Sequence, residues 1–319
     1  MTYCNHHPVF GKYKCLSGKV KDGYSNDFLG VVTKKKYYPL TIPSMNDYPP
    51  FNEEYFEWID LLESVANANK TFTMVELGAG WGRWLARAVG ALRQYNNIPY
   101  YLIGVEAEPT HVRWMKEHFI ENDINLSNCK IVQSAVGKYD GYCKFLTNIP
   151  PSCYGQHIII KGSLDGGSVL TPNLSVPTKS NKDVVISGLK ALSHINIMPI
   201  LKYIYYIKLQ NIRQGKKIKS VSLYTIIKDI KSVDLIDSDI QGSEYDVFSA
   251  LPKEEYNKIK RIHIGTHSIE VENKLRELFN DIGWRNNYDF SIQNTIDTEY
   301  GRIHFIDGVQ SWSNPICKQ

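Results

Sequence analysis

The sequence lacks the features that mark secreted, disulfide-linked and membrane-spanning chains. Its 319 residues include six cysteines, and no two of them form a Cys-x-x-Cys pair. There is no uninterrupted run of about 18 apolar residues, and the N-terminus has no apolar core of a signal peptide. These absences argue against a disulfide framework and a membrane-spanning helix. They predict a cytoplasmic protein.

Acidic residues are missing from one stretch of the chain. Residues 188–220 hold seven basic residues and no acid, although the whole chain has a net charge of only +4. Interleaved tyrosines there favour contact with phosphates and bases, whereas apolar residues at helical spacing favour packing on the core. We favour packing or substrate capping, and keep a nucleic acid and an anionic membrane surface as alternative partners.

A glycine-rich turn follows an apolar strand pattern at 72–77. Glycines occupy every second position after this pattern, at Gly78, Gly80 and Gly82. Glycines let the backbone turn sharply and let a ligand approach main-chain atoms. A dinucleotide-binding turn would have its last glycine at position 83, which is an arginine. The turn therefore predicts a nucleotide-like cofactor other than a dinucleotide.

A second strand pattern, at 100–105, ends in Glu106. The spacing from Gly78 leaves room for one helix and one turn. In doubly wound sheets the ligand lies outside the carboxyl ends of the strands. A carboxylate at this position can accept hydrogen bonds from both hydroxyls of a ribose, so Glu106 is the expected ribose ligand and Glu108 is the alternative.

Strand and helix patterns alternate along most of the chain, which predicts an α/β fold with a mostly parallel sheet and helices on both faces. Strand patterns cover residues 72–77, 100–105, 129–134, 142–147, 233–238 and 261–265. Helix patterns cover residues 51–69, 82–95, 109–121 and 271–281, with shorter ones from 221 and 244. We expect residues 288–314 to close the sheet as an antiparallel pair around Gly301.

We expect three parts in the chain. Residues 1–50 are polar and without clear periodicity, which predicts an N-terminal arm. Residues 51–319 form one domain. Residues 150–219 interrupt the alternation of strands and helices in this domain. Because a loop of this length without secondary structure is uncommon in a compact domain, we expect a helical, lid-like insertion over the cleft.

Carboxylates gather at the carboxyl end of the strand pattern at 233–238. Asp237 and Asp239 lie at this end, and Glu244 opens the next helix, where its charge suits the helix dipole. An acid at the end of a buried strand needs a metal, a hydroxyl or a cation as its partner. Asp239 is therefore a candidate catalytic residue, and for Glu244 both capping and catalysis remain open.

These motifs resemble the FkbM family of class I S-adenosylmethionine-dependent methyltransferases. Glu76 followed by the glycine turn is similar to motif I of that class. Residues 239–244 (Asp-Ile-Gln-Gly-Ser-Glu) are similar to the family's fourth-strand signature, and residues 134–137 to its third-strand exit. The resemblance covers residues 72–147 and 220–312. Two features depart from the family pattern: the long insertion, and Asp237 where the family often has a lysine.

The resemblance implies a Rossmann-like, doubly wound sheet of seven strands and S-adenosylmethionine as the cofactor. It also implies transfer of a methyl group to a hydroxyl of a sugar, glycan or polyketide. The cofactor-binding residues that it implies are Glu76, Gly78, Ala79, Gly80, Trp81, Gly82, Glu106, Ala107, Ser134, Ala135 and Asp239.

Two histidines flank the end of the strand pattern at 261–265. Strand alternation makes His263 a structural residue, whereas His267 lies just past the strand, where the cleft is expected. A histidine can take a proton from a hydroxyl as a methyl group moves onto it. His157, in the insertion, is a weaker candidate.

We predict Asp239, His267 and Glu244 as the catalytic residues, with metal-free base catalysis. The alternative is Mg²⁺ held by Asp237, Asp239 and His267, with Glu244 nearby, because Mg²⁺ favours oxygen ligands.

The expected function is therefore S-adenosylmethionine-dependent O-methylation of a small molecule or glycan, on a hydroxyl of a sugar or glycoconjugate. The alternative is a nucleic-acid-binding protein or an RNA methyltransferase that uses residues 188–220. Peripheral membrane association and a homodimer are both compatible with the sequence.

Overall fold

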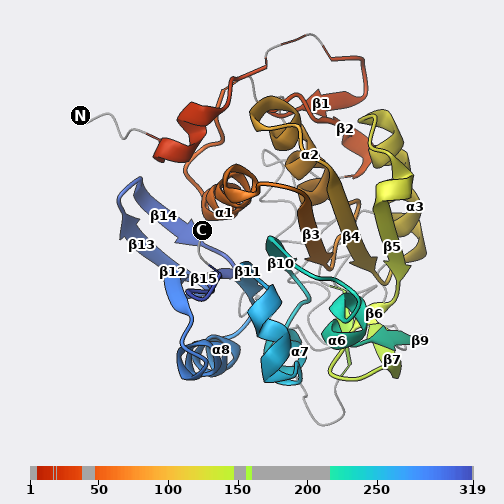
Figure 1. Ribbon diagram of the computed structural model, residues 1–319, viewed down its shortest axis with the longest axis vertical. Helices are drawn as coiled ribbons and strands as arrows, with labels where there is room; N and C mark the ends of the chain where they lie inside the picture. The colour runs from red at the N-terminus through yellow and green to blue at the C-terminus, as the bar shows by residue number, and fades with distance from the viewer. Residues whose placement is uncertain are drawn as a thin grey trace, which may run out of the picture.

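A seven-stranded sheet forms the centre of the molecule (Figure 1). The computed structural model describes residues 6–16, 18, 20–37, 47–146, 156–159 and 216–317. In spatial order the strands are β12 (Arg285–Phe290), β15 (Gly308–Ser313), β11 (Arg261–Thr266), β10 (Leu235–Ser238), β3 (Phe72–Leu77), β4 (Tyr100–Glu106) and β5 (Cys129–Gln133). The last five are parallel, and β15 is antiparallel to both β11 and β12. The predicted seven-stranded, mostly parallel α/β fold is confirmed.

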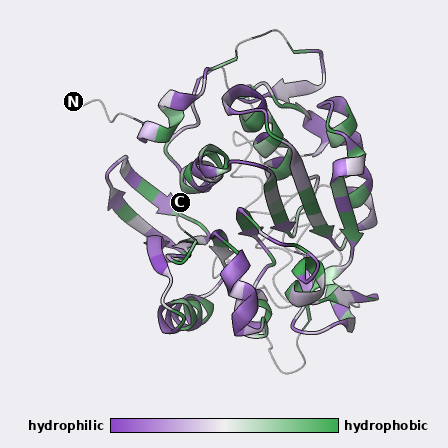
Figure 2. Cartoon of the chain, in the orientation of Figure 1, coloured by the Kyte–Doolittle hydropathy of each residue, from purple (hydrophilic) through white to green (hydrophobic). Residues whose placement is uncertain are grey.

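Helices cover both faces of this sheet because successive strand side chains point to opposite faces. Met74 and Leu102 belong to one hydrophobic cluster, together with side chains of α1 (Glu54–Asn67), α2 (Arg83–Tyr95) and α3 (Pro109–Glu121). Val75 and Ile103 belong to a second cluster, with side chains of α6 (Leu223–Ile227), α7 (Glu244–Ser249) and α8 (Ile269–Asp281). Figure 2 shows hydrophobic residues concentrated on the central strands β3 and β4.

The described part of the predicted N-terminal arm is packed into the first cluster. It contains η1 (Pro8–Lys12), β1 (Tyr24–Asn26), β2 (Val32–Lys34) and η2 (Lys35–Tyr37). Phe10 and Phe28 are fully buried there. This segment therefore contributes to the same core as α1 and α2.

An ion pair links this N-terminal segment to α2. Arg87 Nε lies 3.3 Å from Asp27 Oδ2. The guanidinium also lies over the rings of Trp58 and Trp84, 4.2 and 4.3 Å from their centroids. Both charged side chains are buried, so each depends on the other for charge compensation.

A smaller sheet borders the carboxyl end of β4 and β5. Its order is β6 (Ala135–Val136), β9 (Lys216–Val221), β7 (Gly141–Leu146) and β8 (His157–Ile158). The strand expected at 142–147 is β7, but β9 and β8 were not predicted. They are the described parts of the predicted insertion at 150–219, and they are strands rather than helices. The rest of that insertion, and of the basic segment at 188–220, lies outside the described residues.

The C-terminal region contains two antiparallel pairings instead of the single one expected. The pair around Gly301 is β13 (Asn294–Thr298) with β14 (Gly301–Phe305), a separate hairpin. The strands that close the central sheet are β12 and β15. The remaining short helices are η3 (Leu126–Asn128) and η4 (Lys253–Lys258). Within the described ranges, no helix is long and apolar enough to cross a membrane.

Candidate functional site

The glycine turn after β3 has the left-handed backbone that the sequence suggested. The φ angles of Gly78, Gly80 and Gly82 are +80°, +51° and +68°, values that favour glycine. A β-carbon on Gly78 would overlap the carbonyl oxygen of Asp239. One on Gly82 would lie 2.7 Å from the ring of Phe119 on α3. Gly78 therefore lets the turn touch the end of β10, whereas Gly82 lets α2 pack closely on α3.

Two hollows lie on either side of this turn. The first encloses about 590 Å³, open solvent included, and its lining contains six of the predicted cofactor residues besides Asp239: Gly78, Gly80, Glu106, Ala107, Ser134 and Ala135. The second encloses about 1150 Å³ and is lined by Glu76, Gly78, Ala79, Gly80, Trp81 and Asp239 among others. Four residues line both hollows (Gly78, Gly80, Asp239 and Gln241), so the two meet at the turn.

Glu106 is held at the end of β4 by main-chain donors. Its Oε2 accepts a hydrogen bond from Gly80 N at 2.8 Å, and its Oε1 accepts one from Glu108 N at 2.7 Å. A carboxylate has about four acceptor positions, so it can accept further hydrogen bonds inside the first hollow. Glu108, the predicted alternative, caps α3 instead, with its Oε2 accepting from His111 N.

Phe145, Gln156 and Ile158 complete the wall of the first hollow. Phe145 belongs to β7, Gln156 immediately precedes β8, and Ile158 belongs to β8. All three lie near the first border of the predicted insertion. Nothing in their sequence pattern pointed to the site, because their position depends on the pairing of the small sheet. His157 lies beside them in β8 but lines neither hollow.

The second hollow is strongly acidic. Seven carboxylates line it, together with Arg83 and His263: Glu53, Glu54, Glu57, Glu76, Asp237, Asp239 and Asp307. Burial raises the pKa of Asp237 to about 6. Burial and the neighbouring Asp237 also raise the pKa values of Glu57 and Glu76 well above their ordinary range. This hollow therefore favours a proton or a cation over an anionic ligand.

The imidazole of His267 lies between the carboxylates of Glu244 and Asp239. Its Nδ1 is 2.9 Å from Glu244 Oε1 and its Nε2 is 3.2 Å from Asp239 Oδ1. Burial alone would lower the pKa of His267, but the facing carboxylates of Glu244 and Asp239 raise it well above 6.5. These carboxylates favour the protonated imidazole, which can act as a general base only after it has lost that proton.

The arrangement around Asp239 favours positioning roles for its neighbours. His267 and Glu244 line neither hollow, and Glu244 Oε1 also accepts from Gly242 N at 3.0 Å. The side chain of Asp239 is 60% exposed, and Gln241 Nε2 donates to its Oδ1 at 2.8 Å. Gln241, with a left-handed φ of +55°, was missed by the sequence prediction although it lies within the signature at 239–244.

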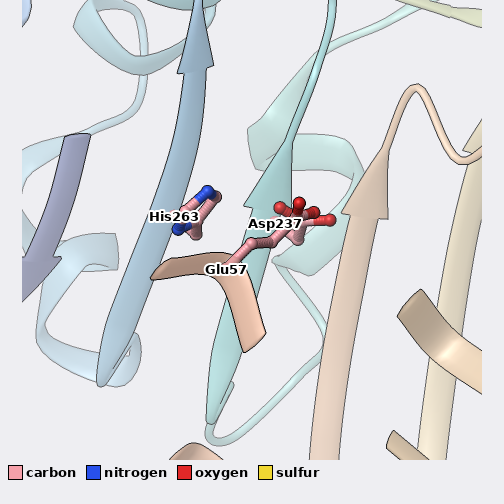
Figure 3. A group of neighbouring side chains, drawn as sticks. All are labelled: Glu57, Asp237 and His263. Atoms are coloured by element: carbon pink, nitrogen blue, oxygen red, sulfur yellow. The ribbon is translucent and has the colours of Figure 1, made fainter. Parts of the chain in front are cut away.

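The predicted metal set of Asp237, Asp239 and His267 is not brought together. Asp237 instead lies beside His263, its register partner on β11. In the described part of the chain, the three potential ligands whose ligand atoms all lie within 4.8 Å of one another are Glu57, Asp237 and His263 (Figure 3). Asp239 is two residues further along, beyond the end of β10, and this separates it from Asp237.

The comparisons with known proteins agree with the sequence motifs. The sequence model of the family described as "Methyltransferase FkbM domain" matches residues 76–290. A protein of Jannaschia sp. (strain CCS1) named "Putative methyltransferase" is 24% identical over 282 residues, which cover 86% of each chain.

Two solved structures are also similar, at low identity. A methyltransferase FkbM from Methylobacillus flagellatus KT has a TM-score of 0.40 and 13% identity, over 77% of this chain and 45% of that one. A precorrin-6y C5,15-methyltransferase from Geobacter metallireducens GS-15 has a TM-score of 0.38 and 8% identity, over 83% and 91% of the two chains.

Proposed function

Because the chain belongs to the FkbM methyltransferase family, we propose that it transfers the methyl group of S-adenosylmethionine to a hydroxyl of a sugar or glycoconjugate. The observation that carries the proposal is the glycine turn with the Glu106 carboxylate fixed beside it by Gly80 N. This pair provides main-chain access for the cofactor and an oriented acceptor for the two ribose hydroxyls.

The two hollows fit the two ends of the cofactor. The first, beside Glu106, Ala107 and Ser134, accepts the adenosine part. The second, beside Glu76 and Asp239, accepts the methionine part, whose sulfonium and ammonium charges suit an acidic lining. When bound, the cofactor supplies an electrophilic methyl group on a positively charged sulfur.

The acidic hollow also supports a polyhydroxylated acceptor. Carboxylates accept hydrogen bonds from sugar hydroxyls, whereas they repel the phosphates of a nucleic acid. Asp239 lines both hollows and therefore lies where the two ends of the cofactor would join, next to the sulfonium and its methyl group. We assign to Asp239 the acceptance of the hydroxyl proton, and to His267 and Glu244 the orientation of Asp239.

In this proposal, most of the rate acceleration comes from positioning the methyl donor and the acceptor hydroxyl. Partial desolvation would raise the pKa of Asp239, but the hydrogen bond and charge of His267, together with Gln241 and Arg83, lower it, so Asp239 is a weak base. Methyl transfer is an in-line displacement, and holding the two reactants in line contributes more than strong base catalysis.

The test is transfer of a labelled methyl group from S-adenosylmethionine to a panel of glycans and to single-stranded RNA. We expect label on a glycan, and expect Asp239→Asn to reduce transfer by roughly 100-fold or more. Glu270→Gln, at an exposed helix position that lines neither hollow, is the control for the expression and purification of the variants. Label on RNA would refute the proposed acceptor, and failure of the protein to bind the cofactor would refute the proposed donor.

A further inference from the structure

Three neighbouring strands place metal-binding side chains in one row. Glu76 on β3, Asp237 on β10 and His263 on β11 are successive register partners, so their side chains point to the same face of the sheet. Helix α1 covers this face and adds Glu57. Figure 3 shows the carboxylates of Glu57 and Asp237 next to each other, with the imidazole of His263 beside them.

The imidazole is oriented by a carboxylate outside the row. His263 Nδ1 lies 2.7 Å from Asp60 Oδ2, and Asp60 follows Glu57 by one turn of α1. Asp60 also accepts from Arg261 Nη1 at 2.5 Å and from Ser311 Oγ at 2.8 Å. Asp60 is therefore ion-paired with Arg261 and accepts hydrogen bonds, so the proton of the imidazole belongs on Nδ1.

The remaining nitrogen of His263 is left for a ligand. Among the described residues Nε2 has no hydrogen-bond partner, although His263 is only 4% exposed. A carboxylate on one imidazole nitrogen and a lone pair on the other is the usual arrangement of a metal-binding histidine. This orientation is independent of the acidic residues in the row.

Arg83 is the guanidinium that acts on the carboxylates of the row, and a further carboxylate shares it. The half-buried Glu57 and the buried Asp237 hydrogen-bond to each other, and Glu76 adds a second buried carboxylate. Arg83 is held by Glu54, with Nη1 to Oε1 at 3.0 Å. Buried carboxylates in such numbers need a shared proton or a bound cation.

We propose that Glu57, Asp237 and His263 bind a divalent transition-metal cation at the inner end of the second hollow. One imidazole and two carboxylates suit ions such as Mn²⁺ and Zn²⁺, whereas Mg²⁺ and Ca²⁺ prefer oxygen ligands alone. Open coordination positions face the hollow, because all three residues line it.

The role of the cation in the reaction rests on the proposed function, whereas the binding of the cation does not. A hydroxyl bound to the cation has a lowered pKa, which offsets the weak basicity of Asp239. The proton passes to Asp239, the hydroxyl oxygen forms a bond to the methyl carbon, and the carbon–sulfur bond breaks. The sulfur leaves with that electron pair as the neutral thioether S-adenosylhomocysteine.

The test measures Mn²⁺ binding to the full chain after treatment with a chelator, without cofactor or acceptor, by electron paramagnetic resonance of free Mn²⁺. We expect one site, with a dissociation constant that rises at least about 10-fold in Asp237→Asn and His263→Asn. His263→Asn keeps a donor facing Asp60 while removing the Nε2 ligand. Asp307→Asn, a carboxylate of the same hollow outside the row, is the matched control and should bind normally.

Folding and ion identity are checked in the same samples. Mn²⁺ should raise the melting temperature of the wild type and of Asp307→Asn but not of His263→Asn. If His263→Asn fails to fold, Glu57→Gln replaces it as the variant that lacks a ligand. Zn²⁺ should displace Mn²⁺, and Mg²⁺ should not at equal concentration. Unchanged binding in the row variants, equal loss in Asp307→Asn, or equal displacement by Mg²⁺ would overturn the proposal. Cofactor binding by the chelated protein is measured in parallel, and its loss would count against the proposed function instead.

Discussion

Gly78 is in contact with the main chain of Asp239: the carbonyl oxygen of Asp239 occupies the space that a β-carbon at position 78 would need. The same contact joins the end of β3 to the end of β10. The contact therefore holds the glycine turn against the segment that contains Asp239. In the proposed function, the binding of the cofactor and the position of Asp239 both depend on this contact.

Gly78→Ala should destabilise the protein and abolish cofactor binding. The left-handed φ of +80° and the overlap with Asp239 together should lower the free energy of unfolding by about 2 kcal/mol or more. Gly283 has nearly the same φ, +77°, but no atom within 4 Å of its added β-carbon. Gly283→Ala should therefore cost only about 1 kcal/mol. Urea unfolding and calorimetric titration with S-adenosylmethionine measure both effects, and equal losses in the two variants would contradict the role of the contact.

Glu106→Gln should weaken cofactor binding while leaving the fold intact. The amide keeps one acceptor for the main chain but loses the charge that strengthens hydrogen bonds to the ribose, worth about 1.5–3 kcal/mol. We expect the dissociation constant for S-adenosylmethionine to rise roughly 10- to 100-fold. Glu108→Gln retains an acceptor for the cap of α3 and should change the constant little. A larger effect of Glu108→Gln than of Glu106→Gln would mean that Glu108 is the residue that binds the ribose.

The charge of His267 should appear in the pH dependence of stability. Its pKa is raised well above 6.5 in the folded protein, so its contribution is complete below about pH 6.5 and is lost as the pH rises through the folded value. His267→Asn keeps a donor facing Glu244 without the charge. Wild type should exceed this variant in stability by on the order of 2 kcal/mol at pH 6, and the margin should shrink toward alkaline pH. Urea unfolding between about pH 6 and 10 checks this, and a constant margin would mean that His267 is neutral.

Asp27→Asn should show that the N-terminal segment belongs to the core. The substitution keeps an acceptor for Leu29 N and Val31 N but leaves the buried charge of Arg87 without its closest carboxylate. We expect a loss of about 3 kcal/mol or more in the free energy of unfolding. Asp22→Asn, at an exposed position of the same segment, should be neutral. A small effect of Asp27→Asn would mean that the segment adds little to the stability of the domain.

The sequence predicted the strands whose side chains are buried on both faces. β3 and β4 are mostly apolar, β10 contains the apolar pair Leu235 and Ile236, and β11 alternates apolar with other residues, and each is followed by a turn or a helix start. β9 escaped prediction because its three lysines resemble the neighbouring basic segment, and because only pairing with β6 and β7 makes it a strand. None of its side chains is fully buried, so the sequence gives no clear apolar pattern there.

The parts of the site that could be predicted are those encoded within a few residues of one another. Gly78, Glu106 and Asp239 each terminate a strand, and parallel strands bring their carboxyl ends together. Glu57 and His263 could not be paired from sequence, because their meeting depends on where α1 crosses the sheet. The protonation of His267 depends likewise on carboxylates from separate segments, which no local pattern reveals.

The register of the small sheet has a consequence for how such enzymes diversify. Phe145 on β7 is the Cα partner of Lys216 on β9, and of Ile158 on β8. The chain therefore leaves the small sheet at β8 and re-enters it at β9, on the other side of β7. Segments of different length and composition can be grafted between these strands while Phe145 and Ile158 keep their places beside Glu106. One donor site can in this way be reused for many acceptors.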